Sequence, residues 1–157
     1  MTTAIPEQVG PLRRLLLVLV LLTIGGLLTE LLLHEHWEDP WQFTPLVLLG
    51  VAAIPTLVLL ARPSRGAVQA FRVVMGLCVV AGALGVLLHY KGNAEFELEG
   101  EPTLRGLALF WTAVRGATPA LAPGAMAQLG LLGLAITWRH PALATRTDTH
   151  PSGGHTT

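Results

Sequence analysis

The chain has little charge and no excess of either sign. Asp, Glu, Lys and Arg make up 13% of its 157 residues, whereas soluble domains carry about 25%. Acidic and basic residues are equal in number, so the net charge gives no reason to expect a nucleic-acid partner. Hydrophobic residues reach 52%. This composition predicts a single polytopic membrane domain whose main partner is the lipid bilayer.

Cysteine and catalytic motifs are also scarce. Cys78 is the single cysteine, so it forms no disulfide within the chain and indicates no redox compartment. We find no phosphate-binding glycine loop, no zinc-protease helix motif and no Ser-His-Asp arrangement with a nucleophile elbow. The sequence therefore favours a non-enzymatic protein, and it predicts no cofactor.

Four apolar runs predict an all-α membrane protein with four transmembrane helices in a bundle. The first run contains one charge, Glu30, between Leu15 and Leu33. A helix over these residues is roughly 28 Å long, close to the thickness of the hydrocarbon core. Pro55 should kink the second helix. The four spans are placed at about residues 12–34, 43–61, 67–89 and 119–139.

Basic residues distinguish the two sides of the membrane. With the N-terminus inside, seven basic residues are cytoplasmic and three are external, which follows the positive-inside rule and places both termini in the cytoplasm. Cytoplasmic tails are expected at residues 1–11 and 142–157, the second disordered because its composition is polar. The inner basic residues are Arg13, Arg14, Arg62, Arg65, Arg72, Arg139 and Arg146, and the outer ones are Lys91, Arg105 and Arg115.

The outer loop, residues 92–118, is expected to contain a short helix, and it could also contain a short extended segment. Residues 95–99 alternate strictly between acidic and apolar side chains, as in a short extended segment. Thr103 can cap a helix over residues 104–114, whose apolar stripe is flanked by arginines. Such an amphipathic helix either lies in the membrane interface or packs on the bundle.

Glu30, His34, His36 and His89 form the candidate site. The first and third spans both run outward, which brings these residues to one depth near the outer boundary. His34 and His89 with carboxylates could bind zinc or another divalent metal, or the two histidines could ligate a b-type haem. Glu30 and His34 could instead line a proton or cation path. The preferred interpretation is that these are interface residues that hydrogen-bond to one another.

Small residues form helix faces suited to close packing. In the first span, Gly26 shares a face with Thr23, Glu30 and His34. This face is expected to look into the bundle or to meet water, because a carboxyl group facing lipid is costly. These faces favour a homo-oligomer or a place in a larger membrane complex. The glycines expected to pack helices are Gly26, Gly82, Gly85, Gly130 and Gly133.

Three segments carry a resemblance to a known group of proteins: residues 89–99, residues 116–124 and His36-Trp37-Glu38-Asp39-Pro40. With these segments the chain resembles small bacterial integral membrane proteins of four spans that have no assigned activity. The likeness covers most of residues 12–141. It implies the same fold and a bacterial plasma-membrane location, and it supplies no reaction, ligand or catalytic residue.

These observations lead to a non-enzymatic membrane protein as the first hypothesis, an accessory or structural subunit that packs within the membrane. The alternative is a cation-handling, haem-binding or metal-binding protein centred on Glu30, His34 and His89. A third hypothesis is an envelope or stress sensor that uses the outer loop.

Overall fold

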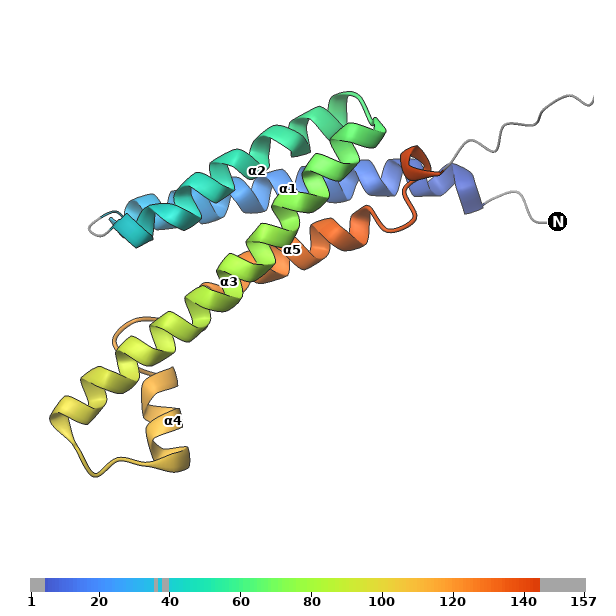
Figure 1. Cartoon of the computed structure of the whole chain (residues 1–157). Coiled ribbons are helices and arrows are strands. Elements are labelled where there is room, and N and C mark those ends of the chain that lie inside the picture. Colours follow the sequence, from blue (N-terminus) through green and yellow to red (C-terminus); the bar gives the residue numbers. More distant parts are fainter. Residues whose placement is uncertain (1–4, 36, 38–39, 145–157) are drawn as a thin grey trace, which may run out of the picture.

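The computed structural model describes residues 5–35, 37 and 40–144, and in this part of the chain every regular element is helical (Figure 1). Two short 3₁₀ helices, η1 (Pro40–Gln42) and η2 (Pro141–Leu143), lie before α2 and after α5. The α-helices are α1 (Ile5–Leu33), α2 (Phe43–Ala61), α3 (Arg65–Gly100), α4 (Gly106–Val114) and α5 (Gly124–Ile136).

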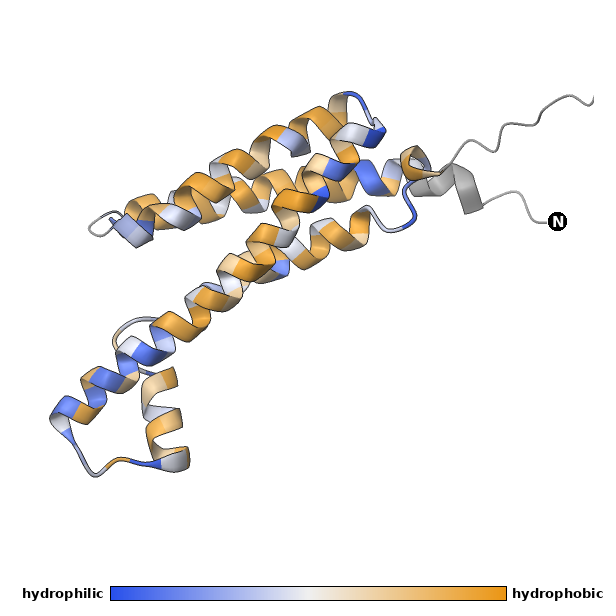
Figure 2. Ribbon diagram, viewed as in Figure 1, coloured by the Kyte–Doolittle hydropathy of each residue, from blue (hydrophilic) through white to orange (hydrophobic). Residues whose placement is uncertain are grey.

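Three of these helices are long and apolar enough to cross a membrane: α1 over Gly10–Leu33, α2 with η1 over Pro40–Ala61, and α3. Figure 2 shows apolar residues along most of their length, with hydrophilic residues concentrated near the far end of α3 and near the turn between α2 and α3. α5 is apolar but has 13 residues, about 20 Å of helix. The fold is therefore that of an all-helical membrane protein with at least three candidate spans.

The helices form a ring of contacts: α1 packs on α2, α2 on α3, α3 on α5, and α5 on α1. In the described chain, no Cα atom of α1 lies within 8 Å of one in α3. The α1–α2 pair and the α3–α5 pair diverge toward the loop between α1 and α2 (Figure 1). The largest fully buried side chains include Phe71, Ile24, Leu49, Leu59, Met75, Val20 and Val68.

Glycines allow α3 and α5 to approach closely. A Cβ atom at Gly82 would clash with the backbone nitrogen of Ala127 and lie 2.8 Å from the carbonyl oxygen of Pro123. A Cβ at Gly130 would lie 2.9 Å from the backbone nitrogen of Val79. Gly85 packs on Pro123, and Gly133 packs on Met75 and Phe71. Gly26 makes no such contact, since nothing lies within 4 Å of its Cβ position.

Several predicted boundaries differ from those in the structure. α2 has the predicted bounds, but α3 continues to Gly100 instead of ending at residue 89. The extended segment predicted over residues 95–99 is wrong because these residues are helical. Glu, Leu and Ala are good helix formers, and Lys91 Nζ lies 3.5 Å from Glu95 Oε1 one turn along the helix. Five alternating residues are too few to override these local preferences.

The ends of three other helices also shift. α1 begins at Ile5, so the expected loose tail over residues 1–11 is wrong from residue 5 onward. α4 begins at Gly106 with Arg105 as its N-cap, and Thr103 instead donates a hydrogen bond to Glu101. Gly106 has φ +58°, a conformation that glycine adopts without strain. α5 begins at Gly124 with Pro123 as its N-cap, and the first residues of the predicted fourth span, 119–123, form a turn before it.

Candidate functional site

Of the four candidate site residues, Glu30 and His34 are brought into contact. His34 Nε2 lies 3.1 Å from Glu30 Oε1, and 66% and 73% of the Glu30 and His34 side chains are exposed. Their spacing of four residues places them on one side of the end of α1. An exposed pair of this kind contributes little to stability.

The helix face that carries Glu30 looks away from the other helices. Thr23, Gly26 and Glu30 are all exposed, so of the two expected settings, the bundle interior and contact with water, this face does not look into the bundle of this chain. The opposite face, with Leu17, Val20 and Ile24, is buried instead.

The structure shows no contact between His34 and His89 among the described residues. His34 follows α1 and His89 lies within α3, and no Cα atom of α1 lies within 8 Å of one in α3. His36 lies outside the residues that the structure describes. Within residues 5–35, 37 and 40–144, no group of three or more His, Cys, Asp or Glu side chains is close enough to hold a metal ion. Glu30 and His34 therefore offer two ligand atoms at one place.

A buried amide on α3, Asn93, forms the best-connected polar site in the described chain. Asn93 is 4% exposed. Its Nδ2 donates hydrogen bonds to the carbonyl oxygens of Ala113 (2.9 Å) and Thr118 (2.7 Å). Its Oδ1 accepts from the backbone N–H (3.2 Å) and the hydroxyl (2.6 Å) of Thr118. Gly116 packs on the Asn93 side chain, and a Cβ there would lie 2.6 Å from Asn93 Cγ.

These bonds join the last turns of α3 to α4, and we call residues 89–118 the outer arm, after the side of the membrane on which the sequence predicts them. Within the arm, the Tyr90 and Phe110 rings lie 5.9 Å apart, and Phe110 meets Trp111 edge to face at 5.4 Å. The Arg115 guanidinium lies 5.6 Å from the Trp111 ring centre, within the range of a cation–π interaction. The large apolar side chains Leu107, Phe110 and Trp111 of α4 are exposed, and Leu107 is the most exposed of the three at 76%.

The sequence contains one clue to this site. Asparagine is a poor helix former, and Asn93 stands inside a helix of 36 residues. The hydrogen bonds that its side chain makes to residues 113 and 118 explain its presence there. The partners lie 20 and 25 residues away, so no local spacing identifies them.

At the other end of the molecule, α1 is joined to the end of α5. One Arg13 guanidinium nitrogen donates to the carbonyl oxygens of Trp138 (3.1 Å) and Arg139 (3.4 Å). These carbonyls follow the last turn of α5, where the negative end of the helix dipole favours a cation. His140 Nδ1 accepts from the backbone N–H of Ala142 at 3.2 Å. Burial, and then the Arg13 charge, lower the pKa of His140, which favours the neutral ring that this bond requires.

Comparison with protein-family models, with curated proteins and with solved structures finds no match to this chain. The class of protein is therefore defined by the fold alone. The fold has an apolar helical body and, beyond it, an arm closed by a buried asparagine. It is an all-helical membrane protein.

Proposed function

We propose that the protein is a non-enzymatic accessory subunit of the bacterial plasma membrane that binds a partner membrane protein through its outer arm. In this proposal α1, α2, α3 and α5 all cross the membrane as a bundle, and both termini are cytoplasmic. α5 is short, but turns at residues 119–123 and 137–140 lengthen it at both ends. The arginines at one end of the helices support the orientation, because they belong on the cytoplasmic side.

The length of α3 is the observation that carries this proposal. α3 has 36 residues, about 54 Å of helix, whereas about 20 residues span the hydrocarbon core. Its last part contains Lys91, Glu95, Glu97 and Glu99, which belong in water. In the proposed orientation this part projects from the outer surface, and the Asn93 hydrogen bonds hold α4 against it.

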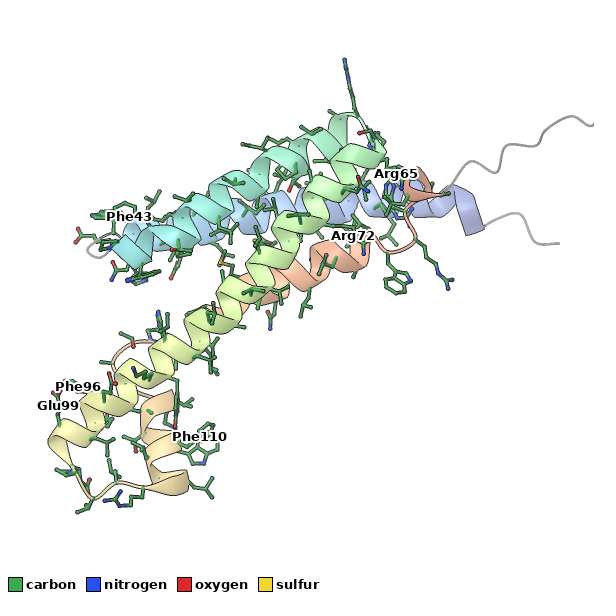
Figure 3. The ribbon with its side chains drawn as sticks, viewed as in Figure 1. Phe43, Arg65, Arg72, Phe96, Glu99 and Phe110 are labelled. Atoms are coloured by element: carbon green, nitrogen blue, oxygen red, sulfur yellow. The ribbon has the colours of Figure 1, made fainter. Side chains whose placement is uncertain are left out.

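The surface of the arm suits contact with another protein. Phe96 is 64% exposed among glutamates on the far part of α3 (Figure 3). Exposed aromatic side chains with charged neighbours are typical of protein interfaces. The glycines of α3 and α5 are less suited to a partner, because Gly82, Gly85 and Gly130 already serve the contact between those two helices.

We further propose that α4 is the amphipathic helix of the outer membrane surface. Figure 1 shows α4 running across the direction of α1 and α2 rather than along it. Leu107, Phe110 and Trp111 are exposed, and Arg105 and Arg115 stand just before and after the helix. An apolar face with arginines at its ends is typical of a helix that lies at the headgroup level.

The proposal is tested by a photo-cross-linker placed at position 96 of the full chain in its native membrane. We expect one discrete adduct of defined mass, and we expect Asn93→Ala to remove it because the arm loses its fixed shape. The matched control carries the cross-linker at Val47, which is 61% exposed on α2 and faces lipid in this proposal. No adduct at position 96, together with a monomer on blue-native gels, would contradict the proposal.

The cation, metal or haem hypothesis has one supporting observation, the contact between Glu30 and His34. A metal site needs a third or fourth ligand at the same place. A haem site needs a second axial ligand near the first. We therefore keep it as the second candidate, after the accessory subunit.

A further inference from the structure

An open groove of about 510 Å³ lies between α3 and the end of α5, lined by Arg72, Leu134, Ala135 and Trp138. Its walls combine one guanidinium group with an apolar surface and an indole ring. Figure 3 shows Arg72 near the start of α3, on the same side of the molecule as Arg65. Both Arg72 and Trp138 are exposed, so their side chains are accessible to a ligand.

The groove lies at the arginine-rich end of the helices. The hydrogen bond from Arg13 to Trp138 places the end of α5 level with Arg13 of α1. Among the described side chains, acidic groups occur near the outer end of α1 and in or beside the outer arm, at residues 30, 35, 95, 97, 99 and 101. Nothing acidic among them therefore neutralises Arg72, and the described side chains at this end give a positive potential around the groove.

Arg72 itself has unused hydrogen-bonding capacity. Within the part of the chain that the structure describes, Arg72 forms no hydrogen bond and no ion pair. A guanidinium group offers five N–H donors in a planar fork that matches a phosphate. The neighbouring Trp138 is of a type that settles at the headgroup level of a bilayer.

We infer that this groove binds the headgroup of an anionic phospholipid of the inner leaflet. The phosphodiester accepts hydrogen bonds from Arg72, Trp138 borders the headgroup, and an acyl chain follows the apolar side of the groove at Leu134. This inference uses the membrane orientation given in the proposed function, and it is independent of any partner of the outer arm. Basic pockets between helices on the cytoplasmic side suit such lipids.

The test is native mass spectrometry of the full chain released from detergent, titrated with phosphatidylglycerol or with phosphatidylcholine. We expect the first phosphatidylglycerol to bind about fivefold more tightly than phosphatidylcholine, the factor that one arginine near the headgroups supplies. Arg72→Gln should abolish this preference. Arg14→Gln is the matched control, since Arg14 is an exposed arginine of α1 that does not line the groove, and it should keep the preference.

Each other outcome overturns the inference. An equal loss of the preference for phosphatidylglycerol in Arg72→Gln and Arg14→Gln would indicate attraction by the overall positive charge. Displacement of the bound lipid by millimolar inorganic phosphate would indicate a site for a free anion. Equal binding of the two lipids by the unmodified chain would exclude recognition of headgroup charge. If Arg72→Gln fails to fold, Arg72→Lys replaces it; this variant keeps the charge but lacks the planar fork, so a weaker preference is expected and an unchanged preference would contradict the hydrogen bonds from the guanidinium group. Arg72→Gln should leave the adduct at position 96 unchanged, which separates this test from that of the proposed function.

Discussion

Asn93 contributes four hydrogen bonds from one side chain, two as donor and two as acceptor. One is made to Ala113 in the last turn of α4 and three to Thr118, which follows α4, in a site where Asn93 is almost completely buried. An amide in such a place is stabilising only if every donor and acceptor has a partner. At the scale of the residue, Asn93 thus links α3 to the end of α4 and to Thr118 within the outer arm.

Asn93→Ala should release α4 from α3. Four bonds at about 1 kcal/mol each predict a loss of roughly 3 to 4 kcal/mol of local stability. Amide hydrogen exchange should therefore become much faster over residues 106–118 and stay unchanged in α2. Thr118→Val, which removes the hydroxyl bond but keeps both backbone bonds of residue 118, should have a smaller effect. Unchanged protection of residues 106–118 in Asn93→Ala would show that the amide does not hold the arm.

The two polar sites differ in how far the sequence predicts them. Glu30 and His34 are four residues apart on one helix, so the spacing alone predicts their contact. Asn93 meets Ala113 and Thr118 after the chain has reversed direction through residues 101–105. The position of that reversal depends on the residue at which α3 ends, and the hydrophobic pattern does not predict this residue. The same limit applies to His34 and His89, because equal depth in a membrane does not imply contact.

At the scale of the element, the contact between α3 and α5 depends on glycine at defined positions. Gly82 faces the backbone of Ala127 without room for a methyl group, whereas Gly76 in the same helix has nothing within 4 Å of its Cβ position. Between membrane helices, where apolar burial provides little driving force, such close packing is a main source of stability.

Gly82→Ala should therefore destabilise the protein and Gly76→Ala should not. The first substitution forces the two helices apart, at a cost of about 1 to 3 kcal/mol. The second improves helix propensity by up to about 1 kcal/mol. Thermal unfolding of the two variants in the same detergent, followed by circular dichroism, measures the difference. Equal melting temperatures would show that close packing at Gly82 is not needed.

Hydrophobic pattern predicts the existence of the helices better than their ends. α2 is bounded by Pro40 and by the Arg62-Pro63 turn, and its limits follow from the sequence. α1 and α3 instead continue into polar sequence at Ile5 and Gly100, because helical hydrogen bonds need no apolar residues once the helix is formed. A run of apolar residues therefore predicts which residues contact lipid, whereas the helix itself can continue into the polar residues on either side.

At the scale of the whole molecule, the two ends have opposite character. The end with Arg13, Arg72 and Trp138 is basic and carries the groove, and the far part of the outer arm is acidic. In the proposed orientation a membrane lies between them, with anionic lipid headgroups at the basic end on the cytoplasmic side and a partner protein at the acidic end on the outer side. Both proposals depend on this arrangement.

Cysteine labelling tests the arrangement most directly. Cys78 is buried and would be replaced in Cys78→Ser, and single cysteines would then be placed by Ser64→Cys, Glu97→Cys and Ala144→Cys. With a membrane-impermeant maleimide on intact cells, we predict labelling at position 97 alone, and labelling at positions 64 and 144 only after lysis. Labelling of positions 97 and 144 from the same side would contradict four spans, and labelling of positions 64 and 97 from the same side would contradict a membrane-crossing α3.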